Sequence, residues 1–468
     1  MAALSDAGKL DHLAWVRAHH GFVSSKLEVY DHFAGTGRGL RATSAIAAGE
    51  LLVKLPRRAL LSAESILDER GRVCGSKACR RALQTARSQG VLDDSDVVAI
   101  FLMWARATRE QQSAELRAYL NALPCVEQGP APLHSTLFWT DAELEWLSGT
   151  DCGAHARAVK QQLREQFGRI VSELFLPHPA LFPLDSAAFT LREYKWAISL
   201  VWSRAMDFSV GTEGALLASR DHGLRAIVPF ADLFNTDFEG PVSHWFVVKE
   251  QAVHVLAKQA FAAGEQVFIN YNATSTSRSL RLYGFALAPL GPRLHHEAIE
   301  LWAAMNPDDP RFGAAQQALR ASLGDGVDPN SQPFLLTAAD PLPRALLVAL
   351  HGQRLVPLPS EQQQQQQQKQ QEEWSLAVLR ELEAALLERR ASYWGGGDRA
   401  KDLRSVLPGA EPKLGAREHM AALVRLGALA VLDRTLKELR AAREQAEQRA
   451  APTPEQAGID TAAIDAMD

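Results

Sequence analysis

The sequence is poor in cysteine and in excess charge, and it has no long apolar run. Four cysteines occur among its 468 residues, and none belongs to a C-x-x-C pair: Cys74, Cys79, Cys125 and Cys152. Structural zinc usually needs four well-spaced ligands, so we expect no metal site, and we expect the thiols to stay reduced. No run reaches the roughly 18 apolar residues of a membrane span. Residues 1–21 have neither a signal-peptide core nor a long Ser- and Arg-rich leader, so we expect that the protein acts outside organelles or that a leader is missing from this sequence. We expect no membrane partner.

The charge balance excludes another class of protein. The 50 basic and 55 acidic residues give a net charge of −5, whereas proteins that bind nucleic acid by neutralising phosphates carry a basic excess. We therefore expect no nucleic-acid partner. The apolar content of 47% and the charged content of 22% are typical of a folded protein. Because a chain of this length exceeds what one hydrophobic core usually organises, we expect two domains.

Residues that carry chemistry concentrate near the middle of the chain. Gly264–Phe285 reads GEQVFINYNATSTSRSLRLYGF. Its alternating apolar residues predict a strand that ends at Tyr271, and a short helix then ends at Tyr283, so two phenols are brought toward one place. Upstream, the apolar run IVPFADLFNT ends at Asp232 and Asn235. Their polar side chains need partners if this segment is buried.

A glycine-rich segment lies near the N-terminus. Residues 35–56 read GTGRGLRATSAIAAGELLVKLP, which predicts two strands separated by a turn at residues 47–50. A phosphate-binding loop needs a helix after it, and here strands are expected on both sides. The glycines are better interpreted as a corner at which the backbone approaches a flat ligand closely. From residue 62 to about residue 200 the pattern turns helical, with an apolar stripe at residues 97–104 and Thr140 as a helix cap.

These segments resemble the SET-domain methyltransferases, in the branch typified by the Rubisco large-subunit lysine methyltransferase. The segments YLNALP, LFWTDAELEWLSGT and WAISLVWSR are similar to that branch too, so the resemblance covers residues 10–445. It implies an α+β fold, namely a SET-domain β core with a pseudo-knot and an inserted helical lobe, followed by an all-α C-terminal domain. It also implies a protein-lysine N-methyltransferase that uses S-adenosylmethionine. Many histone-directed relatives carry a cysteine cluster after the catalytic tyrosine, and none follows Phe285. A non-histone protein with an exposed lysine is therefore the implied partner.

The resemblance also divides the chain. The SET catalytic domain covers residues 10–286, with the helical insertion at about 62–200. A helical substrate-binding domain covers residues 287–447 and contains a Gln-rich linker at 361–373, while residues 448–468 form a disordered tail. Helix-spaced leucines predict a long final helix in the second domain. We expect a monomer in the cytoplasm or nucleus, or in the chloroplast if a leader is missing from this sequence.

The resemblance assigns roles to single residues. Methyl transfer to an amine needs the neutral amine, and a free lysine has a pKa of about 10.4. The site must therefore desolvate and orient the amine. Phenol oxygens suit this task because they accept weak hydrogen bonds from a polarised methyl group. Tyr271 is the implied catalytic residue, and Tyr283 and Phe285 line the implied substrate channel. The implied cofactor-binding residues are Gly39, Leu40, Arg41, Arg204, Asp232, Asn235, Thr236, Tyr271 and Tyr283.

Some features leave alternatives open. The family has histidine where this sequence has Thr236, so a catalytically silent binding module is one alternative. His244 either compensates for that imidazole or is structural. A protein-histidine N-methyltransferase of the same architecture is another alternative, and Tyr283 disfavours it, because the histidine-directed actin methyltransferases of this branch lack this tyrosine. Asp221 and His222 would fit a metal site or a triad, but no third partner has a convincing context.

Overall fold

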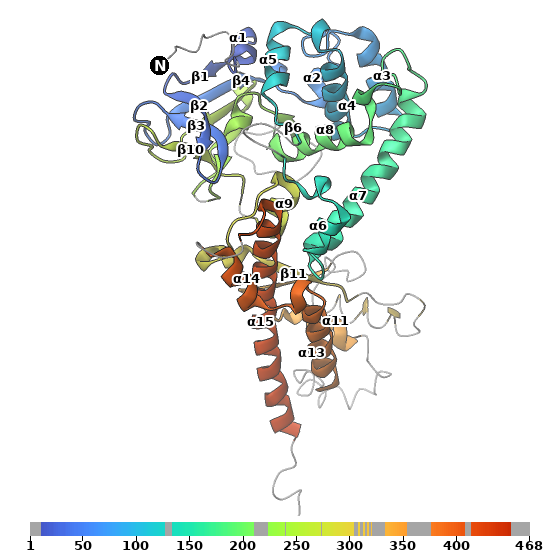
Figure 1. Cartoon of the computed structure of the whole chain (residues 1–468), viewed down its shortest axis with the longest axis vertical. Coiled ribbons are helices and arrows are strands. Elements are labelled where there is room, and N and C mark those ends of the chain that lie inside the picture. Colours follow the sequence, from blue (N-terminus) through green and yellow to red (C-terminus); the bar gives the residue numbers. More distant parts are fainter. Residues whose placement is uncertain are drawn as a thin grey trace, which may run out of the picture. The chain divides into compact units, whose positions relative to one another are not determined.

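The computed structural model divides the chain into two compact units (Figure 1). It describes residues 11–126, 133–209, 223–238, 240–272, 274–303, 333–352, 376–407 and 413–450, with single positions between 304 and 332. The first unit comprises residues 1–139, 156–274 and 279–285, and the second comprises residues 140–155, 275–278 and 286–468. Residues 140–155, which the sequence analysis assigned to the helical insertion, therefore belong to the second unit.

Two four-stranded sheets form most of the β structure of the first unit. The strand order is β1-β4-β9-β8 in one sheet and β2-β3-β10-β7 in the other. A separate antiparallel pair joins β5 to β6. The strands are β1 (Phe22–Val23), β2 (Leu27–Phe33), β3 (Gly37–Ala42), β4 (Leu51–Pro56), β5 (Ala205–Ser209), β6 (Gly223–Ile227), β7 (Asn235–Thr236), β8 (His244–Val247), β9 (Ala252–Leu256) and β10 (Gln266–Ile269).

The two strands predicted at residues 35–56 are present as β3 and β4, but they do not pair with each other. β3 pairs with β2 and β10, whereas β4 pairs with β1 and β9, so the two strands belong to different sheets. The connection between them is anchored by Ile46, which is buried and forms a bridge to Phe261. Ile46 is buried in the same hydrophobic core as side chains of β3 and β4. Its burial therefore fixes the connection between the two sheets.

β7 and β10 lie side by side and run parallel, with Phe268 opposite Asn235 and Ile269 opposite Thr236. Parallel strands cannot be joined by a tight turn and need a crossover connection. Here the connection contains β8 and β9, which form an antiparallel hairpin. The pairing brings the end of the 227–236 segment next to the strand that leads to Tyr271.

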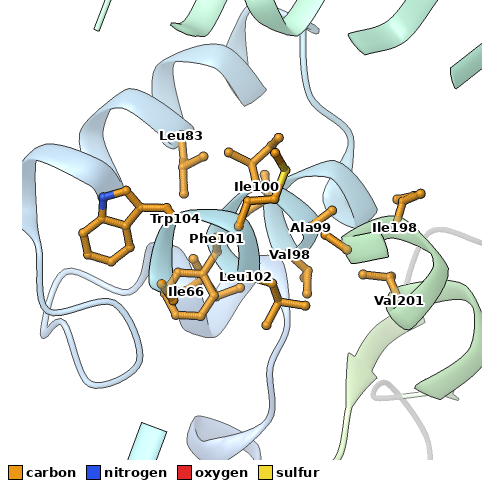
Figure 2. Close-up of a cluster of buried hydrophobic side chains, with 14 of the residues drawn as sticks. Ile66, Leu83, Val98, Ala99, Ile100, Phe101, Leu102, Trp104, Ile198 and Val201 are labelled. Carbon is orange, nitrogen blue, oxygen red and sulfur yellow. The ribbon is translucent and has the colours of Figure 1, made fainter. Parts of the chain in front are cut away.

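The helical lobe of the first unit is built around α4. Every residue from Val97 to Ala105 is buried, which confirms the predicted apolar stripe. Figure 2 shows side chains of α4 packed against Ile198 and Val201 of α8 in this cluster. A capping box of Asp93 and Asp96 begins α4. The helices up to residue 285 are α1 (Ala14–Ala18), α2 (Ala63–Leu67), α3 (Lys77–Ser88), α4 (Asp94–Ala107), α5 (Ala114–Ala122), α6 (Asp141–Glu145), α7 (Asp151–Ile170), α8 (Leu191–Arg204) and α9 (Thr276–Tyr283). Of these, α6 and the first residues of α7 and α9 belong to the second unit.

The second unit is mainly helical, as predicted, but it also contains a two-stranded antiparallel sheet that the sequence analysis missed. Leucines of α13 and α15 form its core at the predicted helical spacing, and Leu336 of the sheet is buried in the same cluster. The predicted cap of α6 is confirmed, because Thr140 and Glu143 form a capping box. The further elements are β11 (Ala298–Leu301), β12 (Phe334–Thr337), α11 (Arg344–Gly352), α13 (Leu376–Ala391), α14 (Arg399–Val406) and α15 (Ala416–Ala450).

Several predictions concern residues outside the described ranges. The Gln-rich linker at 361–373 lies outside them, and so do Asp221 and His222. Of the predicted disordered tail, residues 448–450 continue α15 and the remainder is outside the described residues. Across the described part of the chain, none of the helices combines the length and the apolarity that a membrane crossing requires.

Truncation of a core leucine should destabilise the protein far more than truncation of an exposed one. Leu102 is fully buried, whereas Leu176 is 60% exposed. We expect Leu102→Ala to lower the free energy of unfolding by about 2–5 kcal/mol, because it removes apolar contacts and leaves a cavity. Leu176→Ala should cost less than about 1 kcal/mol. Urea unfolding of both variants measures the difference, and equal losses would contradict the assignment of α4 as the centre of the lobe.

Candidate functional site

Several of the residues singled out from the sequence gather around two cavities of the first unit. The cavities have volumes of about 310 Å³ and about 140 Å³, and both are lined by Ser203, Arg204, Asp232, Tyr271 and Tyr283. We call the first the glycine-side cavity; its further lining is Gly35, Thr36, Gly37, Arg38, Pro124, Leu133, His134, Leu233, Asn235, Gly284 and Phe285. We call the second the histidine-side cavity; its further lining is Ala205, Met206, Asp207, His244, Ile269 and Asn272.

Tyr271 lies two residues beyond the end of β10 and borders both cavities. Its hydroxyl donates a hydrogen bond to the backbone carbonyl of Phe234. Burial raises the pKa of the Tyr271 phenol, so the hydroxyl stays protonated at neutral pH. Since its proton is directed at a fixed carbonyl, the lone pairs of the phenol oxygen are left as acceptors for other groups.

Three further aromatic rings surround Tyr271. Tyr283, the last residue of α9, has its ring centroid 5.1 Å from that of Tyr271. Phe285 stacks on Tyr283 at 5.8 Å, and Phe238 lies 6.4 Å from Tyr271 and 5.9 Å from Phe285. Aromatic pairs at such separations are mutually attractive. The predicted grouping of Tyr271, Tyr283 and Phe285 is therefore present, and Phe238 joins it.

The ion pair of Arg204 and Asp232 forms part of the wall that the two cavities share. Arg204 Nη1 donates to the carbonyl of Asp232 at 2.7 Å and lies 3.3 Å from its Oδ2. The Tyr119 hydroxyl donates to the same Oδ2 at 3.1 Å. Burial raises the pKa of Asp232, and the contacts with Arg204 and Tyr119 oppose this shift. Within the described structure, Arg204 Nε and Asp232 Oδ1 are buried without a hydrogen-bond partner.

Tyr119 is a site residue that the sequence analysis missed. It belongs to the YLNALP segment, which was quoted as part of the resemblance but given no role. A fully buried phenol needs a hydrogen-bond partner, and Asp232 is that partner. The signal was thus present in the motif, but only the fold shows which residue the phenol meets.

The predicted glycine corner contacts the cavity through residues other than those predicted. Leu40 is fully buried in the core, and Arg41 pairs with Glu28 at 2.7 Å, so neither lines a cavity. Gly39 does not line them either, but a Cβ there would lie 2.8 Å from Asn235 Nδ2. Its missing side chain lets Asn235 approach the backbone. The cavity is instead lined by residues 35–38.

Asn235 and Thr236 face different surroundings. Asn235 lines the glycine-side cavity, and its Nδ2 donates to the carbonyl of Arg38 at 2.8 Å. Thr236 lines neither cavity, and its hydroxyl oxygen accepts from the backbone N–H groups of Tyr271 and Phe238. Of the two residues, Asn235 is therefore the one whose side chain can reach a ligand.

His244 lies in the histidine-side cavity, at the start of β8. Burial lowers its pKa to about 4, so the imidazole is neutral at physiological pH. Among the described residues, its buried Nδ1 has no hydrogen-bond partner. The ring lies edge-on to Phe208 at 6.3 Å. It therefore adds a neutral polar group to the wall.

A larger cavity of the first unit, of about 1030 Å³, lies away from these residues. Its charged lining is largely paired internally, with Arg57 2.6 Å from Glu64 and Arg87 2.7 Å from Asp94. It contains neither of the clustered tyrosines. Size alone therefore does not make it the better candidate for chemistry.

Comparison with known proteins agrees with this geometry. The family model of the SET domain matches residues 37–272. The chloroplastic fructose-bisphosphate aldolase-lysine N-methyltransferase of Arabidopsis thaliana is 28% identical over 310 residues, which are 64% of this chain and 55% of that protein. The actin-histidine N-methyltransferase of Homo sapiens is 24% identical over 320 residues, which are 68% of this chain and 48% of that protein. The chain thus spans about half the length of these curated relatives.

Solved structures share the fold over a longer range. A structure described as Rubisco LSMT bound to AdoMet has a TM-score of 0.71 and 21% sequence identity. The similarity covers 95% of this chain and 94% of that chain. At this identity the likeness demonstrates the fold, including its C-terminal part.

Replacement of His244 by Asn should weaken the dependence of stability on pH. Because the folded pKa of about 4 lies below the unfolded value of about 6.5, the folded protein binds fewer protons between these values. The free energy of unfolding should therefore fall as the pH drops from about 6.5 to 4, by up to about 3 kcal/mol. In His244→Asn this contribution should be absent. Urea unfolding between pH 7 and pH 4.5 measures it.

The control for this experiment is His20→Asn, at an exposed position. It should keep the pH dependence of the native protein. Identical curves for the native protein and His244→Asn would show that the imidazole titrates normally in the fold.

Proposed function

Because the chain belongs to the SET-domain family, we propose that it transfers a methyl group from S-adenosylmethionine to a lysine side chain of a non-histone protein. The observation that carries the proposal is the position of Tyr271, which lines both cavities and whose phenol hydroxyl is fixed by the Phe234 carbonyl. One cavity would hold the methyl donor and the other the target side chain. The printed activities of the relatives, N-methyl transfer to lysine or histidine, support the same class of reaction.

The residues of the glycine-side cavity fit the proposed donor. Bound S-adenosylmethionine would supply an electrophilic methyl group on a sulfonium, together with a carboxylate and an adenosine. Arg204 has a buried Nε without a partner in the described structure, and a guanidinium suits a carboxylate. Asn235 would bind the nucleoside, since its amide lines the cavity. Gly35 and Gly37, with φ of 81° and 67°, let the loop follow the cavity wall closely.

We assign the chemistry mainly to alignment. Tyr271 would accept weak C–H···O bonds from the methyl group, because its own proton is occupied by Phe234. Tyr283 would confine the target amine beside it, since the two rings lie 5.1 Å apart. The low exposure of these groups favours the neutral form of a lysine amine. Asp232 would act as a positioning residue, because Arg204 and Tyr119 already engage its carboxylate.

Lysine is the proposed target, and histidine is the alternative. Tyr283 supports lysine, because the resemblance associates this tyrosine with lysine-directed members. The similarity to an actin-histidine N-methyltransferase supports the histidine alternative. A catalytically silent binding module is less well supported, because Tyr271 keeps the geometry described above. For the compartment we propose the cytoplasm or nucleus, with the chloroplast as the alternative that the Arabidopsis relative supports.

The proposal is tested by labelling a whole-cell protein extract with methyl-labelled S-adenosylmethionine and the purified protein. Acid hydrolysis and mass spectrometry then identify the methylated amino acid. Methyl-lysine is expected. Detection of methyl-histidine would show that the target is histidine instead of lysine. Binding of an extract protein without any methyl transfer would favour the binding module.

Removal of one phenol oxygen should abolish most of the activity. In Tyr271→Phe the ring remains and the acceptor oxygen is lost, so kcat should fall by about 100-fold or more, as for other single polar groups that act on the transition state. Binding of S-adenosylhomocysteine by calorimetry should change little, because the ring still lines the cavity.

The matched control is Tyr30→Phe. Tyr30 lies on β2, its ring faces the Arg41 guanidinium at 4.0 Å, and it lines neither cavity. This variant should keep the native kcat. Equal activity of Tyr271→Phe and the native protein would remove Tyr271 from the proposed role.

A further inference from the structure

Thr236 joins two chain segments through one buried oxygen. Its hydroxyl oxygen accepts a hydrogen bond from the backbone N–H of Tyr271 at 3.2 Å and another from the backbone N–H of Phe238 at 3.0 Å. The residue is 9% exposed, so water competes little for these bonds. Thr236 thus contacts the backbone of the proposed catalytic tyrosine without lining either cavity.

The N–H of Tyr271 needs this acceptor because the strand ladder ends before it. The last pair of the parallel ladder is Ile269 with Thr236, and Tyr271 lies two residues further on. Asn272 then turns the chain with φ of 73°, and its own N–H is bonded to Asn270 Oδ1 at 2.7 Å. A buried backbone N–H is almost always paired. The Thr236 hydroxyl takes the place of the missing ladder partner.

Residues 234 and 236 therefore hold Tyr271 at both ends. The carbonyl of Phe234 accepts from the phenol hydroxyl, and the hydroxyl of Thr236 accepts from the backbone N–H. Phe234 is fully buried, so its carbonyl is fixed in the core. Between these two contacts the side chain of Asn235 is fixed by the Arg38 carbonyl. A three-residue segment thus orients both Tyr271 and Asn235.

The second bond of Thr236 serves the aromatic cluster. Phe238 has φ of 60°, in the left-handed region that non-glycine residues avoid. A threonine oxygen that accepts the N–H two residues further along stabilises such a tight turn. The turn places the Phe238 ring against those of Tyr271 and Phe285.

We propose that Thr236 is a positioning residue for methyl transfer: its hydroxyl oxygen sets the backbone position of Tyr271 and thereby the direction of the phenol oxygen. This inference rests on the proposed function. The proposal requires a short, uncharged side chain that carries a hydrogen-bond acceptor. It requires no contact between this side chain and the methyl donor. Serine can supply that acceptor, and valine, which has the same shape as threonine, cannot.

Activity separates these two replacements. In Thr236→Val we expect kcat to fall about 10- to 100-fold, because small displacements of an aligned group slow a reaction by such factors. KM for the target peptide and the Kd for S-adenosylhomocysteine should change less than about threefold. Thr236→Ser should recover most of kcat. Equal losses in both variants, or a loss confined to cofactor binding, would overturn the proposal.

A measurement that does not depend on activity uses the amide of Tyr271 itself. The chain has six tyrosines, so labelling with ¹⁵N-tyrosine gives few amide signals, and the signal absent from Tyr271→Phe identifies Tyr271. Its amide hydrogen should exchange at least about 10-fold faster in Thr236→Val than in the native protein or in Thr236→Ser. Unchanged exchange in Thr236→Val would overturn the proposal even if kcat falls.

One control variant and one substitute variant keep the result interpretable. Thr43→Val makes the same chemical change at an exposed residue and should alter neither kcat nor the Tyr271 amide. If Thr236→Val does not fold, Thr236→Ala replaces it, with the same expectations. If the native protein transfers no methyl group, the proposed function fails, while the exchange experiment still tests whether Thr236 holds Tyr271.

Discussion

The site depends on the parallel pairing of β7 with β10. It places Asn235 opposite Phe268, so that the cavity-lining amide and the strand that leads to Tyr271 share one sheet edge. The pairing is short, and two hydrogen bonds hold Tyr271 beyond the end of the ladder: its backbone N–H donates to the Thr236 hydroxyl oxygen, and its phenol hydroxyl donates to the Phe234 carbonyl. Tyr271 can therefore leave the strand while both of these donors keep a partner.

The wall between the cavities is polar, and its charge is balanced internally. Asp232 is buried, and burial raises its pKa, which opposes ionisation. Arg204 supplies the opposite charge, and Tyr119 supplies a further donor to the same oxygen. Removing one member would leave a buried group unpaired, which is more harmful than replacing the whole set. This interdependence explains why a tyrosine of the helical lobe belongs to the site.

The sequence could identify many residues of this site, but it could not show which other residues they contact. The apolar period of α4 and the short helix that ends at Tyr283 each follow from a local rule, and both were predicted correctly. The separation of β3 from β4 was not predictable, because the alternation of apolar residues predicts strands but does not specify which strands pair. The motif likewise placed Leu40 near the ligand, whereas its side chain belongs to the core. Which side of a strand faces a cavity depends on tertiary packing, and a short sequence motif does not specify that packing.

Thr236 shows how a departure from a family pattern can still meet the physical requirement of its position. A neutral imidazole has one acceptor nitrogen, whereas a hydroxyl oxygen has two lone pairs and can accept from two N–H groups at once. Here Tyr271 and Phe238 supply those two donors. Threonine also suits a strand, since its branched Cβ favours extended backbone. In this chain Thr236 supplies acceptor capacity close to the backbone, and this explains how the site keeps its tyrosine in place with threonine at this position.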